Sequence, residues 1–172
     1  MLKLTTCLGA LALALAACAS QPAAVAVPAN LVPAGERAVE RLGARGVQIY
    51  ECRNKVGGSG TEWVFVAPEA DLFDVQGAPA GKHYAGPHWE LADGSRIVGT
   101  AKARADAPLA GAIPWLLLSA RSVGGPGRLA KITSVQRVNT AGGAAPATGC
   151  DAASLGRTER VPYTADYILL AP

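Results

Sequence analysis

The chain has 172 residues, half of them hydrophobic, and 16 basic against 13 acidic residues give it a net charge of +3. A nucleic-acid-binding surface normally needs clustered basic residues, and no run of like charges follows the first 17 residues, so we expect no nucleic-acid partner. The length fits one ordinary domain of roughly 100 to 200 residues. After Leu15, no stretch approaches the ~20 consecutive apolar residues that a membrane-spanning helix needs.

Residues 1–17 have the parts of a secretory signal peptide: Lys3 as a positive start, an apolar segment over 8–15, and small residues before a cleavage site. The sequence Leu15-Ala16-Ala17-Cys18 resembles the bacterial lipobox, which implies cleavage before Cys18 and acylation of its thiol. We therefore expect a protein held to the bacterial cell envelope through its lipid anchor only. By the sorting pattern of lipoproteins, Ala19 rather than Asp after the cysteine favours the outer membrane, facing the periplasm.

The sequence after the leader divides into a tether and a domain. Residues 18–33 are rich in Ala and Pro and almost uncharged, which is typical of a semi-extended tether, and residues 34–172 are expected to form one folded domain. From Gly46 onward, short runs rich in Val, Ile, Tyr and Trp alternate with Gly, Pro, Asp and Asn, so we expect a mainly β domain. Residues 36–45 fit either a short helix or an edge strand.

The first predicted strands are residues 47–52 and 62–66, joined by the turn-forming sequence Gly57-Gly58-Ser59-Gly60. Next, residues 68–74 are predicted to form one short helical turn. Pro suits the first helical position, and the acidic residues suit the positive end of a helix dipole. Leu72 and Phe73 would be the packing residues of this turn.

Residues 88–98 are predicted to form a β-hairpin. A two-residue Asp93-Gly94 loop would place charged side chains opposite apolar ones, whereas a three-residue Ala92-Asp93-Gly94 loop places Glu90 opposite Arg96 and Trp89 opposite Ile97. We therefore predict the three-residue loop, with Gly94 in the left-handed conformation.

Three later strands complete the expected sheet. Residues 112–120 are almost continuously apolar, as in a strand buried on both faces, with Pro114 at its beginning or on an edge. Residues 130–139 are expected to form a strand of mixed pattern, and 161–170 a final strand that would place Tyr163 and Tyr167 on one face. Seven or so antiparallel strands in one domain predict a β-sandwich or a small barrel with long loops.

The cysteine inventory predicts one disulfide bond. With Cys7 in the leader and Cys18 acylated, Cys52 and Cys150 remain, in an exported compartment where disulfides persist. The alternative is two unpaired thiols.

A family resemblance is carried by eight segments: 46–52, 67–74, 81–87, 89–90, 93–95, 111–118, 135–140 and 161–167. Together they resemble an exported protein family of unknown function, domain of unknown function thirty-four fifty-five. The resemblance covers roughly residues 30 to 170, and the family has no established activity or catalytic residues to transfer.

The part of this resemblance least like ordinary strand sequence is 82–90. We take it as the candidate ligand-binding segment, because loops on rigid scaffolds often carry function. Its aromatic and polar side chains suit a glycan, a peptide or another envelope protein. The candidate residues are Lys82, His83, Tyr84, His88, Trp89 and Glu90.

The function favoured by the sequence is a lipid-anchored, non-catalytic envelope binding module without a cofactor. The alternative is a small exported metal-assisted hydrolase, in which His83, His88, Glu69 and Asp71 would supply ligands if the fold brought them together. No Gly-x-Ser-x-Gly sequence marks a nucleophilic serine. Catalytic residues are therefore not assigned.

Overall fold

The computed structural model describes residues 26–172. The expected signal peptide, Cys7, the lipidation site Cys18 and the first part of the tether lie outside the described residues. Within 26–172, no helix is both long enough and apolar enough to cross a membrane.

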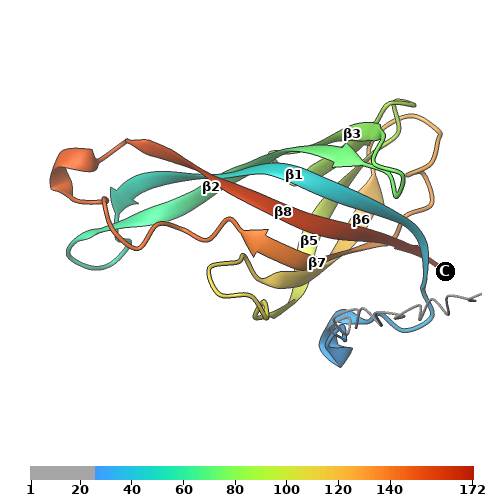
Figure 1. Ribbon diagram of the computed structural model, residues 1–172, viewed down its shortest axis with the longest axis horizontal. Coiled ribbons are helices and arrows are strands. Elements are labelled where there is room, and N and C mark those ends of the chain that lie inside the picture. Colours follow the sequence, from blue (N-terminus) through green and yellow to red (C-terminus); the bar gives the residue numbers. More distant parts are fainter. Residues whose placement is uncertain (1–25) are drawn as a thin grey trace, which may run out of the picture.

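Eight antiparallel strands form a closed barrel in which each strand is hydrogen-bonded to its neighbours in the sequence, and β1 also pairs with β8 (Figure 1). The mainly β, single-domain prediction is confirmed, and the strand order is that of a small barrel. Two short 3-10 helices are the only helical segments among the described residues. The elements are η1 (Ala29–Leu31), β1 (Arg37–Asn54), β2 (Thr61–Phe73), β3 (Pro79–Tyr84), β4 (His88–Leu91), β5 (Arg96–Ala105), β6 (Trp115–Ser122), β7 (Ser134–Gly142), η2 (Ala152–Ser154) and β8 (Thr158–Ala171).

The strands differ greatly in length, and this leaves the barrel wall incomplete. β1, β2 and β8 have 18, 13 and 14 residues, whereas β3 and β4 have six and four. The β2–β3 pairing therefore ends at Ala70↔His83, and the β4–β5 pairing ends at His88↔Val98. Beyond the tip of the β3–β4 hairpin, residues 61–69 of β2 pair only with β1, and residues 100–105 of β5 pair only with β6.

The opposite end of the barrel, which carries the β4–β5 turn, is filled with side chains. The β6–β7 loop folds over this end: the backbone N–H of Leu129 donates to Ser95 Oγ at 3.2 Å, and that of Arg128 donates to Asp93 Oδ2 at 2.9 Å. We call this the plugged end. It is defined by the buried side chains of Leu72, Leu91, Ile97, Leu129 and Leu169.

The N-terminal segment covers the outer face of β6. Leu31 of η1 is completely buried and packs with Trp115, Leu117 and Val138 in a second apolar cluster. The apolar run of β6 is therefore buried on both faces, as the sequence indicated, and Pro114 immediately precedes the strand. The last part of the expected tether, 29–31, docks on the barrel instead of extending freely.

The predicted helical turn over 68–74 is wrong, because these residues belong to β2 and its end. Pro68, Ala70 and Leu72 are buried while Glu69 and Asp71 are exposed, which is the alternation of a half-buried strand. Burying this apolar face outweighs the weak helix-start signal. Pro68 lies in the part of β2 that has one partner strand, where a missing backbone donor is tolerated.

The hairpin register and the ambiguous segment are both settled by the pairing. Glu90 lies opposite Arg96 and Trp89 opposite Ile97, so the three-residue loop is confirmed. Gly94 has φ of +80°, as the bulged turn requires. Residues 37–45 are strand, the first half of β1.

The predicted disulfide is confirmed. Cys52, near the end of β1, is bonded to Cys150, which precedes η2. The bond ties the ribbon formed by β1, β2 and β8 to the long connection between β7 and β8, where packing alone holds little (Figure 1).

Candidate functional site

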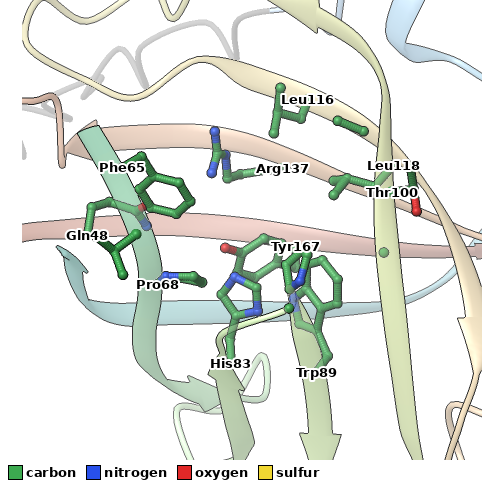
Figure 2. A pocket seen from close by; sticks show the side chains of 15 residues that line it. Gln48, Phe65, Pro68, His83, Trp89, Thr100, Leu116, Leu118, Arg137 and Tyr167 are labelled. Atoms are coloured by element: carbon green, nitrogen blue, oxygen red, sulfur yellow. The ribbon is translucent and has the colours of Figure 1, made fainter. Parts of the chain in front are cut away.

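A cavity of about 510 Å³ occupies the half of the barrel beyond the plugged end (Figure 2). All eight strands and the β3–β4 turn contribute residues to its lining. The lining residues exposed to solvent are Phe65 and Val66 on β2, Gly86 in the β3–β4 turn, and Thr100 and Ala101 on β5. The mouth of the cavity therefore lies where the wall is interrupted between these strands, and we call this half the open end.

Most of the cavity wall is apolar. Leu116 and Leu118 of β6 face Phe65 and Pro68 of β2 across the space (Figure 2). Phe65 is 50% exposed, although burying an aromatic ring is favourable. An apolar lining that is left partly accessible is typical of a site for an apolar ligand.

Trp89 of β4 forms the wall between the cavity and the plugged end. Its side chain is 1% exposed, and its ring packs edge-on against Tyr167 at a centroid distance of 5.2 Å. A Cβ atom added to Gly99 on the neighbouring strand would lie 2.8 Å from this ring, so the ring occupies the space that a larger residue would need. The absence of a side chain at Gly99 therefore leaves the space in which the Trp89 indole lies.

His83 of β3 stacks on Trp89, with ring centroids 4.4 Å apart. Its Nδ1 lies 2.8 Å from the backbone oxygen of His88, and because a carbonyl only accepts, Nδ1 carries the proton and donates. Burial lowers the pKa of His83 from 6.5 to about 3. The imidazole is therefore neutral at physiological pH, with Nε2 unprotonated.

The cavity contains one cationic side chain, that of Arg137 on β7. Its Nε and Nη2 donate to the backbone oxygen of Pro114 at 3.1 and 2.9 Å. Within residues 26–172, no carboxylate forms an ion pair with it. Burial lowers the pKa of Arg137, but a guanidinium remains protonated in proteins. A positive charge without a counter-charge thus lies in a largely apolar space.

Two phenols accompany this charge. The hydroxyls of Tyr163 and Tyr167 lie 3.3 Å apart, and both rings are buried. Burial raises the pKa of each phenol above its ordinary value, so both are neutral hydroxyls and Arg137 has no phenolate partner.

Two further donors in the cavity lining lack acceptors. Gln48 Nε2 and Trp89 Nε1 are buried without a hydrogen-bond partner among the described residues, and the side chains are 2% and 1% exposed. An unsatisfied buried donor costs about 1–3 kcal/mol. The polar side chains of the cavity lining include three that carry hydrogen-bond donors, those of Gln48, Arg137 and Tyr167 (Figure 2). They give an otherwise apolar cavity a donor-rich end.

The six residues predicted from the 82–90 segment divide between the two faces of the sheet. His83 and Trp89 point into the barrel and line the cavity. The other four residues lie on the outer face, since successive strand residues point to opposite sides. These are Lys82, Tyr84, His88 and Glu90.

The outer four residues form a surface network of their own. The Tyr84 hydroxyl donates to Glu90 Oε2 at 2.6 Å, and Arg96 Nη1 lies 3.4 Å from the same oxygen. The hydrogen bond from Tyr84 and the charge of Arg96 lower the pKa of Glu90. Tyr84 also stacks on His88, with centroids 5.3 Å apart, and Lys82 forms an ion pair with Asp71.

The residues considered for a metal site do not gather around one point. Glu69 and Asp71 lie on the outer face of β2, where Glu69 accepts a hydrogen bond from Arg160 at 2.8 Å, whereas His83 lies inside the barrel. Over residues 26–172, no group of three or more His, Cys, Asp and Glu side chains is placed to hold a metal ion.

Several cavity residues were not identified from the sequence, notably Gln48, Phe65 and Arg137. One sequence feature could have indicated Arg137: it is a charged residue inside the expected strand 130–139. Its face could be assigned only once the barrel closure was known. Gln48, in a strand of apolar and aromatic residues, carried a similar signal.

Comparison with known protein families identifies a match over most of the chain. Residues 33–171 match the family described as "Protein of unknown function (DUF3455)", in agreement with the resemblance seen in the sequence. No curated protein and no solved structure matches the chain. The match covers nearly all of the described barrel, and the chain therefore belongs to the DUF3455 family.

Proposed function

We propose that this protein is a lipid-anchored, non-catalytic binding protein of the bacterial envelope, and that its barrel cavity takes up one small, largely apolar molecule. The observation that carries the proposal is the cavity of about 510 Å³ that opens between β2 and β5. Small-molecule sites usually measure about 300–1,000 Å³ and are mostly apolar with a few polar groups. Barrels of eight strands are about the right width to hold one small ligand.

The shape of the wall supports a small molecule better than a glycan or a protein partner. A glycan needs many hydrogen-bonding groups, whereas this lining is dominated by Phe65, Trp89, Leu116 and Leu118. We therefore assign the binding site to the inward-facing residues of the 82–90 segment and not to its outer surface. The Tyr84–Glu90–Arg96 network on the outer face already satisfies much of its own hydrogen bonding.

The envelope location in this proposal rests on the sequence of residues 15–18. The Cys52–Cys150 disulfide supports it, because structural disulfides persist in exported proteins and are rare in the cytosol. Lipid at Cys18 would hold the barrel close to the membrane surface, where sparingly soluble apolar molecules partition.

The test is direct binding of a neutral fluorescent hydrophobe. Residues 18–172 are exported behind a cleavable secretory signal, with Cys18→Ser so that no lipid is added, and titrated with N-phenyl-1-naphthylamine. We expect saturable one-to-one binding with a blue-shifted, enhanced emission. Absence of saturable binding by the folded protein would overturn the proposal.

A matched pair of variants locates the bound probe. Ala101 lines the mouth of the cavity, and the adjacent Lys102 is also exposed but does not line it. Ala101→Trp should weaken binding at least tenfold by filling the mouth, while Lys102→Trp should leave it within threefold of the unaltered protein. Equal affinities for the two variants would place the probe elsewhere and contradict the proposed site.

A further inference from the structure

The cavity described above is apolar along most of its wall and rich in hydrogen-bond donors at one end. The donors are the guanidinium of Arg137, the amide of Gln48 and the hydroxyl of Tyr167, and no described carboxylate faces them. A ligand that completes this arrangement has an acceptor at one end and a hydrocarbon body at the other.

The guanidinium of Arg137 carries a charge that no described carboxylate neutralises. A buried charge without a partner is costly, and proteins normally pair such groups. Arg137 is held in place by two hydrogen bonds to Pro114 O, so its orientation is set by the backbone before any ligand arrives. Hydrogen bonds between a guanidinium and an anionic oxygen are about twice as strong as neutral ones.

The neighbouring donors strengthen the same conclusion. Gln48 lines the cavity, and its buried Nε2 has no acceptor among residues 26–172. An acidic head group offers several oxygen lone pairs, so it can accept from the guanidinium and the amide together. An alcohol or an amine could not satisfy both donors equally well, and an amine would carry a repelled charge.

We propose that the cavity binds an amphipathic acid, a molecule with one anionic, oxygen-bearing head group on an apolar chain or ring. The head group would bind Arg137 and Gln48. The apolar body would pack against Trp89, Leu116 and Leu118. This inference rests on the proposed function, because it names the class of ligand for the same cavity. Arg137 is the specificity-determining residue for the charge of the ligand.

The experiment compares three ligands that share one hydrocarbon chain. Decanoate, 1-decanol and decylamine are each used at pH 7.5 to displace N-phenyl-1-naphthylamine from the protein. We expect decanoate to displace the probe at a concentration at least tenfold lower than 1-decanol, and decylamine to be the weakest competitor. Saturable probe binding with no preference for decanoate would overturn this inference and leave the proposed function intact, whereas absence of probe binding would overturn both.

A matched pair of arginine variants assigns the preference to one residue. Arg137→Met should weaken decanoate competition at least tenfold and leave 1-decanol within threefold. Arg121→Met removes an exposed charge that does not line the cavity and should change neither. Retention of the full decanoate preference in folded Arg137→Met would overturn the assignment.

A second measurement on the unaltered protein needs no variant. The preference for decanoate should disappear as the pH falls through the pKa of a carboxylic acid, roughly 4 to 5. The titratable groups beside Arg137 do not confuse this measurement, because Tyr50, Tyr163 and Tyr167 remain neutral phenols and the pKa of His83 is already lowered to about 3. A preference that persists at pH 3.5 in the folded protein would contradict recognition of the anion.

Discussion

The two ends of this barrel are built from the same strands but are filled in different ways. At the plugged end, Leu129 from the β6–β7 loop is buried together with the apolar side chains of Leu72, Leu91 and Leu169. At the open end, β1, β3 and β7 carry Gln48, His83 and Arg137 around a cavity of about 510 Å³. The difference shows that strand length decides where the barrel interior is accessible, because the short β3–β4 hairpin closes the wall at one end and leaves it open at the other.

This contrast also separates stability from binding. Proteins gain most of their stability from close-packed apolar side chains, so the plugged end should carry much of the folding free energy. The open end keeps an accessible space and unsatisfied donors, which reduce stability and are useful only when a ligand is bound. Substitutions at the two ends should therefore differ in what they change.

The largest expected effect is a difference in stability between two leucine truncations. Leu72→Ala at the plugged end, where Leu72 is 0% exposed, should lower the free energy of unfolding by about 2–5 kcal/mol. Leu116→Ala, beside the existing cavity, should cost about 1 kcal/mol, because its side chain is only partly buried. Urea unfolding followed by tryptophan fluorescence measures both, and equal losses would contradict the division of the barrel into two ends.

A smaller effect is expected at the boundary between the ends. Gly99→Ala would place a Cβ atom 2.8 Å from the Trp89 ring and push the ring towards the cavity, at a cost of about 1–3 kcal/mol. Gly43→Ala is the matched control in β1, because a Cβ atom there meets nothing within 4 Å. Thermal unfolding and N-phenyl-1-naphthylamine titration should show weaker folding and weaker binding for Gly99→Ala alone. A Gly99→Ala variant as stable as Gly43→Ala would show that the ring does not depend on this glycine.

The smallest expected effect, taken over the single pH unit between 6 and 5, is the dependence of stability on pH at the open end. The pKa of His83 is lowered to about 3 in the folded protein, against about 6.5 when the chain is unfolded. The unfolded state therefore binds more protons below pH 6.5, and the free energy of unfolding should fall as the pH decreases from 6.5 towards 3. Between pH 6 and 5, the slope due to this residue should approach ~1.4 kcal/mol per pH unit.

The matched variant for this measurement is His83→Gln, which keeps a side-chain donor without the titrating ring. Its urea unfolding free energy should be nearly independent of pH between 6 and 5, because the carboxylates with a lowered pKa, such as Asp93 at about 2, destabilise the fold only below this window. An unchanged slope in His83→Gln would assign the pH dependence to other groups.

Local sequence patterns predicted most of the strands and the pairing of one hairpin. Residues 47–52 and 161–170 are strands, and the opposition of Glu90 to Arg96 follows from charge and from the period of two alone. The disulfide followed from the number of cysteines that remain after the leader. The prediction of a helical turn over 68–74 was wrong, because Pro and acidic residues indicate a helix start only weakly. The burial of Ala70 and Leu72, which makes this segment a strand, depends on strands distant in the sequence.

The candidate site was predicted only in part, for a geometric reason. The segment 82–90 does reach the cavity, but alternation along a strand means that only His83 and Trp89 face it. Gln48 and Arg137 lie 89 positions apart in the sequence and meet the same space only because β1 and β7 flank β8. No local pattern indicates that two such residues share a wall.

The sequence by itself determined the β class of the domain, the cysteine pair and which residues of each strand share a face, because these depend on composition and on the period of two. Tertiary structure alone decided which face became the interior and where the wall stays open between β2 and β5. It also placed Arg137 inside the barrel, where no carboxylate of the described residues pairs with it. Closure of a barrel depends on the lengths and pairings of all eight strands together, so no single segment of the sequence predicts the cavity.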